Sequence, residues 1–195
     1  MRNGLIVVLS FVLLQMISTK SYCQETTATA FSNFYIENNT VVYKKVFELP
    51  NQNENEVKDA LLKFINKVPN VSNVRESGNE VFADISNMKI NYQKYGGSYM
   101  STLILLNHSM FAKLIVQIKD HKYRILIKDI YFMDDESLLS LNSKKEMDNR
   151  TDLTPVITKA HASEFKSSSI IVKGMGYLNS QFIDLFTYTQ QQDKW

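Results

Sequence analysis

The chain has 195 residues, of which 22 are Lys or Arg and 20 are Asp or Glu, so its formal net charge is only +2. A balance this close to neutrality excludes the global basic field by which proteins attract nucleic acids or membrane surfaces. The single cysteine, Cys23, excludes an internal disulfide and a thiolate metal centre.

The first 23 residues have the pattern of a secretory signal peptide. Arg2 precedes an apolar run, Leu5 to Ile17, which is too short to cross a bilayer as a stable helix. Cys23 is a small residue directly before a cleavage position at Gln24. We therefore predict an exported mature chain that begins at Gln24 and contains no cysteine.

Two alternatives to a cleaved signal peptide are an uncleaved membrane anchor and a lipoprotein. The short apolar run argues against the anchor. In the lipoprotein, Cys23 would carry the lipid. Lys20 and Tyr22 stand where the lipidation motif has a Leu-like and a small residue, so lipidation is not predicted.

Residues 24–195 are predicted to form one domain, which opens with strands and a helix. Phe31 to Glu37 and Thr40 to Leu49 read as strands joined by a turn at Asn38-Asn39. Asn53 is then expected to cap a helix, with Glu56 in the capping-box position. Apolar side chains follow at helical spacing, at Val57, Leu61, Phe64, Ile65 and Val68.

Further short strands are predicted from alternating or apolar runs at 71–75, 81–92 and 99–106. A break is expected near Ser86-Asn87, and Gly96-Gly97 reads as a turn. Connections this short require antiparallel neighbours, because parallel strands need crossovers of about a dozen residues or more.

Residues 111 to 132 form the clearest hairpin in the sequence. A two-residue turn at Asp120-His121 directs six apolar side chains to one face of the sheet, whereas a three-residue turn would scramble that face. The six side chains belong to Leu114, Val116, Ile118, Tyr123, Ile125 and Ile127. Arg124 falls on the opposite face, where we interpret it as exposed charge that protects a sheet edge.

The C-terminal part is predicted to contain a polar loop at 133–168, with a weak helical patch at 137–141, and a helix at 169–190. Apolar residues of that helix recur at i, i+4, i+7 and i+8, at Leu178, Phe182, Leu185 and Phe186. The order of elements predicts an α+β fold. In it, a curved antiparallel β-sheet carries an N-terminal-side helix and a C-terminal helix packed on one face.

Two segments resemble a family of secreted bacterial domains of unknown function. The segment 41–68 is similar to the family's opening strand and helix. The segment 116–132 is similar to its signature strand, in which a Lys-Asp turn precedes an aromatic-Arg pair, here Tyr123-Arg124. This chain has His121 where the family commonly has glycine. The resemblance implies a TBP-like (TATA-box-binding-protein-like) fold with a helix-grip arrangement. It supplies no active site. From the signal peptide together with this resemblance, we predict a location in the periplasm or at the cell surface of a Gram-negative bacterium.

The sequence predicts no catalytic, cofactor-binding or metal site. Its histidines, His108, His121 and His161, lack metal-ligand spacing. The acidic run 134–136 lacks the ordered ligand spacing of a cation-binding loop and reads as a helix start. Tyrosines flank the Gly96-Gly97 turn, where they would form either an aromatic binding lip or packing on a hairpin. These are Tyr92, Tyr95 and Tyr99.

Two functions are compatible with these patterns. The first is a non-catalytic binding or protein-interaction module whose partner is an unknown envelope protein. The alternative is a periplasmic carrier of a small apolar ligand, held in a cavity between the sheet and the C-terminal helix. An enzyme is not predicted, and neither are a cofactor, a nucleic-acid partner or a transmembrane segment in the mature chain.

Overall fold

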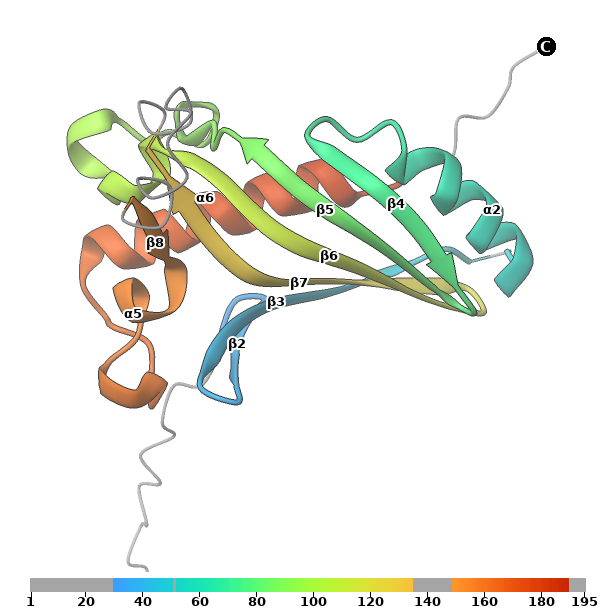
Figure 1. Cartoon of the computed structure of the whole chain (residues 1–195), viewed down its shortest axis with the longest axis horizontal. Coiled ribbons are helices and arrows are strands. Elements are labelled where there is room, and N and C mark those ends of the chain that lie inside the picture. The colour runs from blue at the N-terminus through green and yellow to red at the C-terminus, as the bar shows by residue number, and fades with distance from the viewer. Residues whose placement is uncertain (1–29, 51, 135–148, 190–195) are drawn as a thin grey trace, which may run out of the picture.

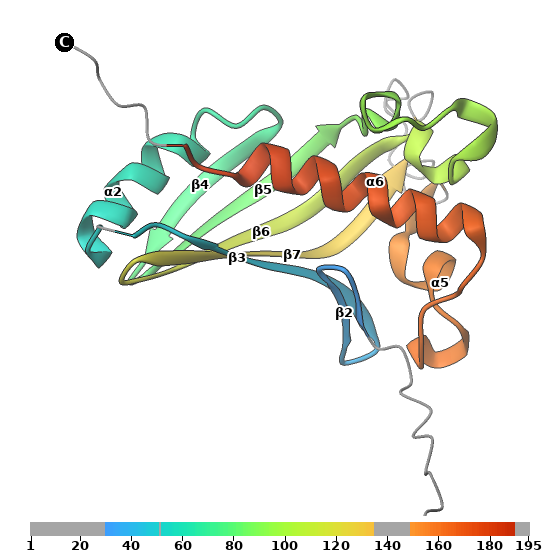
Figure 2. The same cartoon turned by 180° about the vertical axis from the view of Figure 1, so that it is seen from behind.

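The structure is a computed structural model that describes residues 30–50, 52–134 and 149–189. In these ranges the chain forms an antiparallel sheet of eight strands, and the long helix α6 runs along one face of it (Figures 1 and 2). The α+β prediction is confirmed. The predicted signal peptide at 1–23 and the helical patch at 137–141 lie outside the described residues.

The strands follow a meander-like order in space, β1-β2-β3-β7-β6-β5-β4, with β8 beside β7. In chain order they are β1 Ala30–Phe31, β2 Phe34–Glu37, β3 Thr40–Glu48, β4 Val71–Ser77, β5 Glu80–Met88, β6 Ser109–Lys119, β7 Lys122–Met133 and β8 Arg150–Asp152. The α-helices are α2 Glu54–Ile65, α5 Leu153–Ile157 and α6 Ser169–Phe186. The 3₁₀ helices are η1 Tyr92–Tyr95, η2 Tyr99–Ser101, η3 Ile104–Asn107 and η4 Ala160–Ala162.

The β6–β7 hairpin has the predicted register. Ile118 lies opposite Tyr123 and Lys119 opposite Lys122, so the turn consists of Asp120 and His121. All six apolar side chains assigned to one face belong to the core, and none is more than 2% exposed. The sequence alternation therefore determines this hairpin, because any slip by one residue would expose the whole set.

His121 has a φ of +61° in this turn, a conformation that favours glycine over residues with a Cβ atom. His121→Gly should therefore raise the free energy of unfolding, by about 0.5–1 kcal/mol. Chemical denaturation of both proteins measures the change. Gly78→Ala is the matched control with the opposite sign, because Gly78 has a φ of +59°. A less stable His121→Gly protein would contradict the prediction.

Three bulges interrupt the long strands. The strand registers shift at Asn73 in β4, at Asn87 in β5 and at Asp129 in β7, and all three residues have positive φ. Asn and Asp tolerate this conformation better than other residues with a Cβ atom. The predicted break near Ser86-Asn87 is thus confirmed as a bulge. Because bulges bend the strands that carry them, they help to curve the sheet around α6 (Figure 2).

Helix α2 begins with the predicted capping box. The Asn53 side chain accepts the backbone N–H of Glu56 at 3.1 Å, and the Glu56 carboxylate accepts the N–H of Asn53 at 2.9 Å. The Asp120 carboxylate also accepts the N–H of Glu54 at 2.9 Å, which links the β6–β7 turn to the helix. Val57, Leu61 and Ile65 point into the core with no exposed surface.

Helix α6 starts at the predicted residue and packs its apolar stripe on the sheet. Phe182 is fully buried, with its ring 4.9 Å from that of Tyr43 in an edge-to-face arrangement. Beyond the end of the helix, the Tyr123 hydroxyl donates to the Phe186 carbonyl at 2.6 Å and accepts the Tyr188 N–H at 2.8 Å. One sheet residue therefore satisfies two backbone groups at the helix C-terminus.

Several predicted boundaries differ from the structure. Helix α6 ends at Phe186 and not at 190, and β5 ends at Met88 and not at 92. The first strand is split by Ser32, which has a φ of +53° and turns the chain between β1 and β2. The predicted polar loop at 133–168 contains β8, α5 and η4. All three residues of β8 are exposed, so no alternation of apolar residues marked it in the sequence.

The strand predicted at Tyr99 to Leu106 is wrong, since these residues form η2 and the start of η3. β5 pairs directly with β6, so the segment between them has no position in the sheet. The segment packs on α6 instead. Gly174 permits the close approach, because a Cβ atom there would lie 2.9 Å from the Cβ of Leu103.

Candidate functional site

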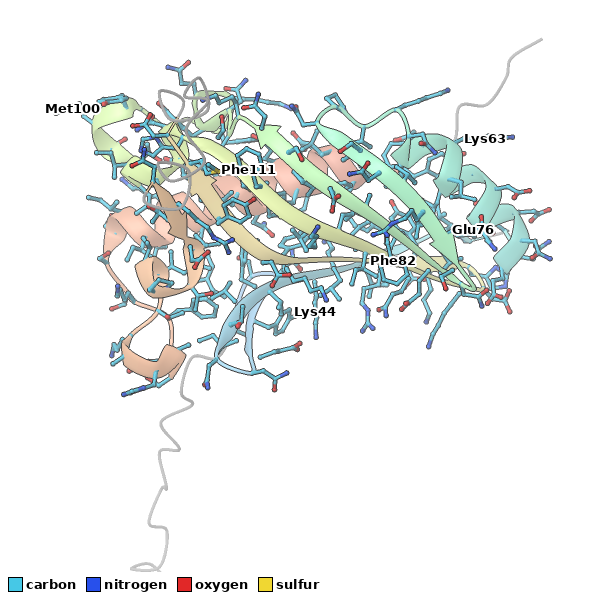
Figure 3. All side chains as sticks on the ribbon, viewed as in Figure 1. Lys44, Lys63, Glu76, Phe82, Met100 and Phe111 are labelled. Carbon is cyan, nitrogen blue, oxygen red and sulfur yellow. The ribbon has the colours of Figure 1, made fainter. Side chains whose placement is uncertain are left out.

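Large apolar side chains are exposed together at one end of the molecule. Met100 is 88% exposed, Ile104 70%, Tyr99 62% and Ile170 49%. We call these four residues the apolar end surface. Figure 3 places Met100 at the end of the molecule opposite Lys63 of α2. Large apolar side chains that gather in exposed positions on neighbouring elements are a feature of interaction sites.

The two parts of this surface meet because the loop between β5 and β6 packs on α6. Ile170, Gly174 and Tyr177 follow one another at helical spacing on one side of α6. Leu103 lies against Gly174, and a Cβ atom at Gly97 would lie 2.9 Å from the Tyr177 ring. The loop therefore covers the side of the helix on which Ile170 lies one turn earlier. Figure 2 shows the loop against the N-terminal half of α6.

The tight turns of η3 divide one apolar run between the inside and the outside of the protein. Leu103, Leu105 and Leu106 are buried, whereas Ile104 between them points to solvent. Leucine packing thus fixes the backbone that presents Ile104. This exposure could not be predicted, because an uninterrupted apolar run is typical of a buried strand.

The predicted cluster of three tyrosines is not a single site. The Tyr92 hydroxyl donates to the Asn107 side chain at 2.7 Å, and the Tyr95 hydroxyl donates to the Asp184 carboxylate at 2.9 Å. Only Tyr99 of the three belongs to the apolar end surface. The hairpin on which they were expected to pack does not form, and two of them tie the loop to itself and to α6.

A charge cluster supports the loop on the α6 side. The Lys94 ammonium lies 2.6 Å from the Asp184 carboxylate, which also accepts the Tyr95 hydroxyl. These two hydrogen bonds hold the pKa of Asp184 below its usual range. The carboxylate therefore stays ionised and paired across the neutral pH range.

The segments that carry the surface contain no acidic residue. Residues 85–119 and 165–183 include neither Asp nor Glu. Lys173 is exposed three residues after Ile170, and so on the same side of α6. Of the described acids that contact these elements, Asp184 pairs with Lys94, whereas Asp134 lies 3.7 Å from the His108 ring and is half exposed. Within the described residues, the loop and the first part of α6 therefore carry basic side chains and no acidic ones.

A second, polar depression of about 810 Å³ lies near the tip of the β6–β7 hairpin. On its floor, Arg124 donates to the Gln117 side chain at 2.7 Å, and Gln117 donates to Glu80 at 2.6 Å. The interpretation of Arg124 as an edge guard is wrong, because β7 lies between β3 and β6. Arg124 instead takes part in a hydrogen-bonded row across three strands, in which its guanidinium binds Gln117 and Gln117 binds Glu80.

The three histidines lie apart. His108 lies beside Asp134, His121 forms the hairpin turn, and His161 lies in η4 with a φ of +57°. Among the described residues, no three His, Cys, Asp or Glu side chains converge on a possible metal position. In the same part of the chain, no helix is long and apolar enough to cross a membrane.

The space beneath α6 is filled by side chains. Leu178, Phe182 and Phe186 have no exposed surface, and Leu185 is partly buried against the same core. Phe182 contacts the rings of Phe34 and Tyr43, which rise from the sheet. The carrier hypothesis needs a cavity at this position, and the described side chains occupy it.

Comparison with known proteins gives two similar structures. No protein family and no curated protein matches the sequence. A TBP-like protein from Parabacteroides distasonis is 19% identical, with a TM-score of 0.48 over 77% of this chain and 92% of that one. A DUF4468 family protein from Bacteroides ovatus is 12% identical, with a TM-score of 0.49 over 80% of this chain and 90% of that one. Their descriptions agree with the resemblance seen in the sequence, and they state no activity, ligand or partner.

Proposed function

We propose that this protein is a non-catalytic binding module of the bacterial cell envelope, and that it engages its partner through the apolar end surface. The observation that carries the proposal is the joint exposure of Tyr99, Met100 and Ile104 on one loop. The envelope location rests on the signal-peptide pattern at 1–23, which would export the chain and remove Cys23 or leave it at the terminus.

The energetics favour a binding role for this surface. Burying a Met, Ile or comparable side chain stabilises a protein by about 1.5–3 kcal/mol, so leaving several of them in water forgoes a sizeable part of the folding free energy. The same side chains become favourable contacts when a partner covers them. Scattered single exposures need no such explanation, but four together at one end do.

The surface is also held in place before it binds. The Tyr92–Asn107 and Tyr95–Asp184 hydrogen bonds fix the two ends of the loop, and the packing of Leu103 on Gly174 fixes its middle. Binding then costs little conformational entropy, because the backbone is already ordered. A pre-ordered apolar loop is a property expected of a recognition element.

Retention on isolated envelopes tests this proposal. The mature protein from Gln24 onward should sediment with envelope fragments, and the double variant Met100→Ser/Ile104→Ser should lose most of that retention. Val46→Ser is the matched control, because Val46 is 50% exposed on β3 and lies outside the apolar end surface. Circular dichroism of each variant verifies the fold. Equal retention of the wild type and the double variant would overturn the proposed surface, and retention of neither would overturn the function.

A further inference from the structure

We infer that the apolar end surface binds the face of an anionic phospholipid bilayer. This inference rests on the proposed function and names the partner of the same site. It combines three features of the described residues: the apolar side chains at the tip, the basic character around them and the small, protruding shape of the contact.

The side chains at the tip suit the boundary between lipid headgroups and acyl chains. Met100 and Ile104 project from a loop and are the most exposed large apolar side chains of the described chain. Tyr99, next to Met100, has an apolar ring and a polar hydroxyl, the combination that is enriched where membranes meet water. Apolar elements of this kind insert about 5–10 Å into a bilayer surface without spanning it.

The charge around the tip complements an anionic surface. The protein as a whole is nearly neutral, so an attraction must be local. The loop at 89–108 and the first part of α6 provide it, because neither contains an acidic residue and Lys173 is exposed three residues after Ile170. A lysine near an anionic bilayer strengthens binding, whereas an acidic side chain at the same place would oppose it. Of the described acids on packed elements, Asp184 pairs with Lys94, and Asp134, beside His108, is the one acidic group that opposes this attraction.

The size and shape of the surface favour a bilayer over a protein partner. A stable protein–protein interface usually takes about 20–30 residues from each side and a complementary shape. The apolar end surface consists of four side chains, of which Met100 lies at the extremity of the molecule (Figure 3). A fluid lipid surface adapts to such a tip and needs no complementary shape, so the contact can be small, reversible and dependent on lipid composition.

Co-sedimentation with pure lipid vesicles tests the inference, with the mature protein from Gln24 so that the apolar run at 5–17 cannot contribute. Vesicles of phosphatidylcholine with phosphatidylglycerol should bind the protein, and phosphatidylcholine alone should bind it several-fold more weakly. Raising the salt concentration should remove most of this difference, because salt screens exposed charges. Met100→Ser/Ile104→Ser should weaken binding at least roughly tenfold, and Lys173→Gln about fivefold.

Two control variants test whether the loss of binding is specific to the apolar end surface, because each removes an exposed apolar side chain or an exposed charge elsewhere on the protein. Val46→Ser removes an exposed apolar side chain from the sheet, and Lys63→Gln removes an exposed charge from the opposite end of the molecule (Figure 3). Both variants should bind like the wild type. Absence of binding to the anionic vesicles, or equal binding by the Met100→Ser/Ile104→Ser variant, would overturn the inference.

The lipid inference and the proposed function can fail separately. If the protein is retained on envelopes through the apolar end surface but does not bind lipid vesicles, its partner is a protein. In that outcome the inference is overturned and the binding module stands. If it binds neither envelopes nor vesicles, both are overturned.

Discussion

Phe182→Ala is expected to lower the free energy of unfolding by about 3–5 kcal/mol, the range measured for large-to-small substitutions in well-packed cores. Phe182 has no exposed surface, and its ring contacts those of Tyr43 at 4.9 Å and Phe34 at 6.3 Å between centroids. Truncation would remove these contacts and leave a cavity that the curved sheet and α6 cannot fill by collapsing.

Denaturant unfolding of the wild type, Phe182→Ala and Ile170→Ala measures this effect. Ile170 lies on the same helix but is 49% exposed, so its truncation should cost less than about 1 kcal/mol. A similarly small loss for Phe182→Ala would show that the space beneath α6 tolerates a cavity. That result would restore the carrier hypothesis, which the filled core otherwise leaves without a ligand position.

Stability should also fall steeply above pH 10. Burial raises the pKa of Tyr123 to about 12, an effect that the hydrogen bond from the Tyr188 N–H partly offsets. Burial raises the pKa of Tyr43 well above its usual range as well, with a smaller opposing contribution from Asn33. Between pH 10 and 12 the unfolded chain loses protons that the folded protein keeps. The free energy of unfolding therefore falls by up to about 1.4 kcal/mol per pH unit for each group.

For Tyr123 alone the loss should reach roughly 2–3 kcal/mol by pH 12, and below pH 10 neither tyrosine should contribute a pH dependence. Denaturant unfolding at a series of pH values from 8 to about 11.5 measures the slope. Two single variants, Tyr123→Phe and Tyr43→Phe, should each reduce that slope. A wild-type stability that stays constant up to pH 11.5 would contradict this prediction.

The same two variants should differ near neutral pH. Tyr123→Phe leaves the Phe186 carbonyl and the Tyr188 N–H without their partner, which should cost about 1–3 kcal/mol. The Tyr43 hydroxyl is buried and no hydrogen bond reaches it from the described residues, although the Asn33 amide lies near enough to affect its pKa. Tyr43→Phe should therefore be close to neutral or slightly stabilising. An equal loss in both variants would contradict this assignment.

The parts of the fold that could be predicted are those for which a short sequence pattern is compatible with only one local structure. The β6–β7 register follows from six apolar residues that share a face in only one alignment. The start of α2 follows from the Asn53–Glu56 spacing, which the structure shows as a reciprocal pair of hydrogen bonds. Neither feature depends on which distant element packs against it.

The apolar end surface could not be predicted, because its geometry depends on distant contacts. The composition of residues 99–106 is that of a strand, and only the direct pairing of β5 with β6 excludes it from the sheet. The exposure of Ile104 depends on the packing of its leucine neighbours on α6. Likewise, the sequence around Arg124 is compatible with an edge strand, and only the pairing of β3 with β7 shows that the strand is internal. Only one property of this surface could be read from the sequence, namely that residues 85–119 and 165–183 contain no Asp or Glu.

The close approach of Leu103 to Gly174 has a consequence for how binding and folding are related. Leu103 and Gly174 are separated by about seventy positions of chain, so the loop that carries Met100 is held against α6 only after this last helix has docked on the sheet. A peptide that spans 95–108 would carry three of the four side chains without the support that orients them. The orientation of these apolar side chains therefore requires the complete fold. Under the proposed function, only folded copies of the chain would bind the partner.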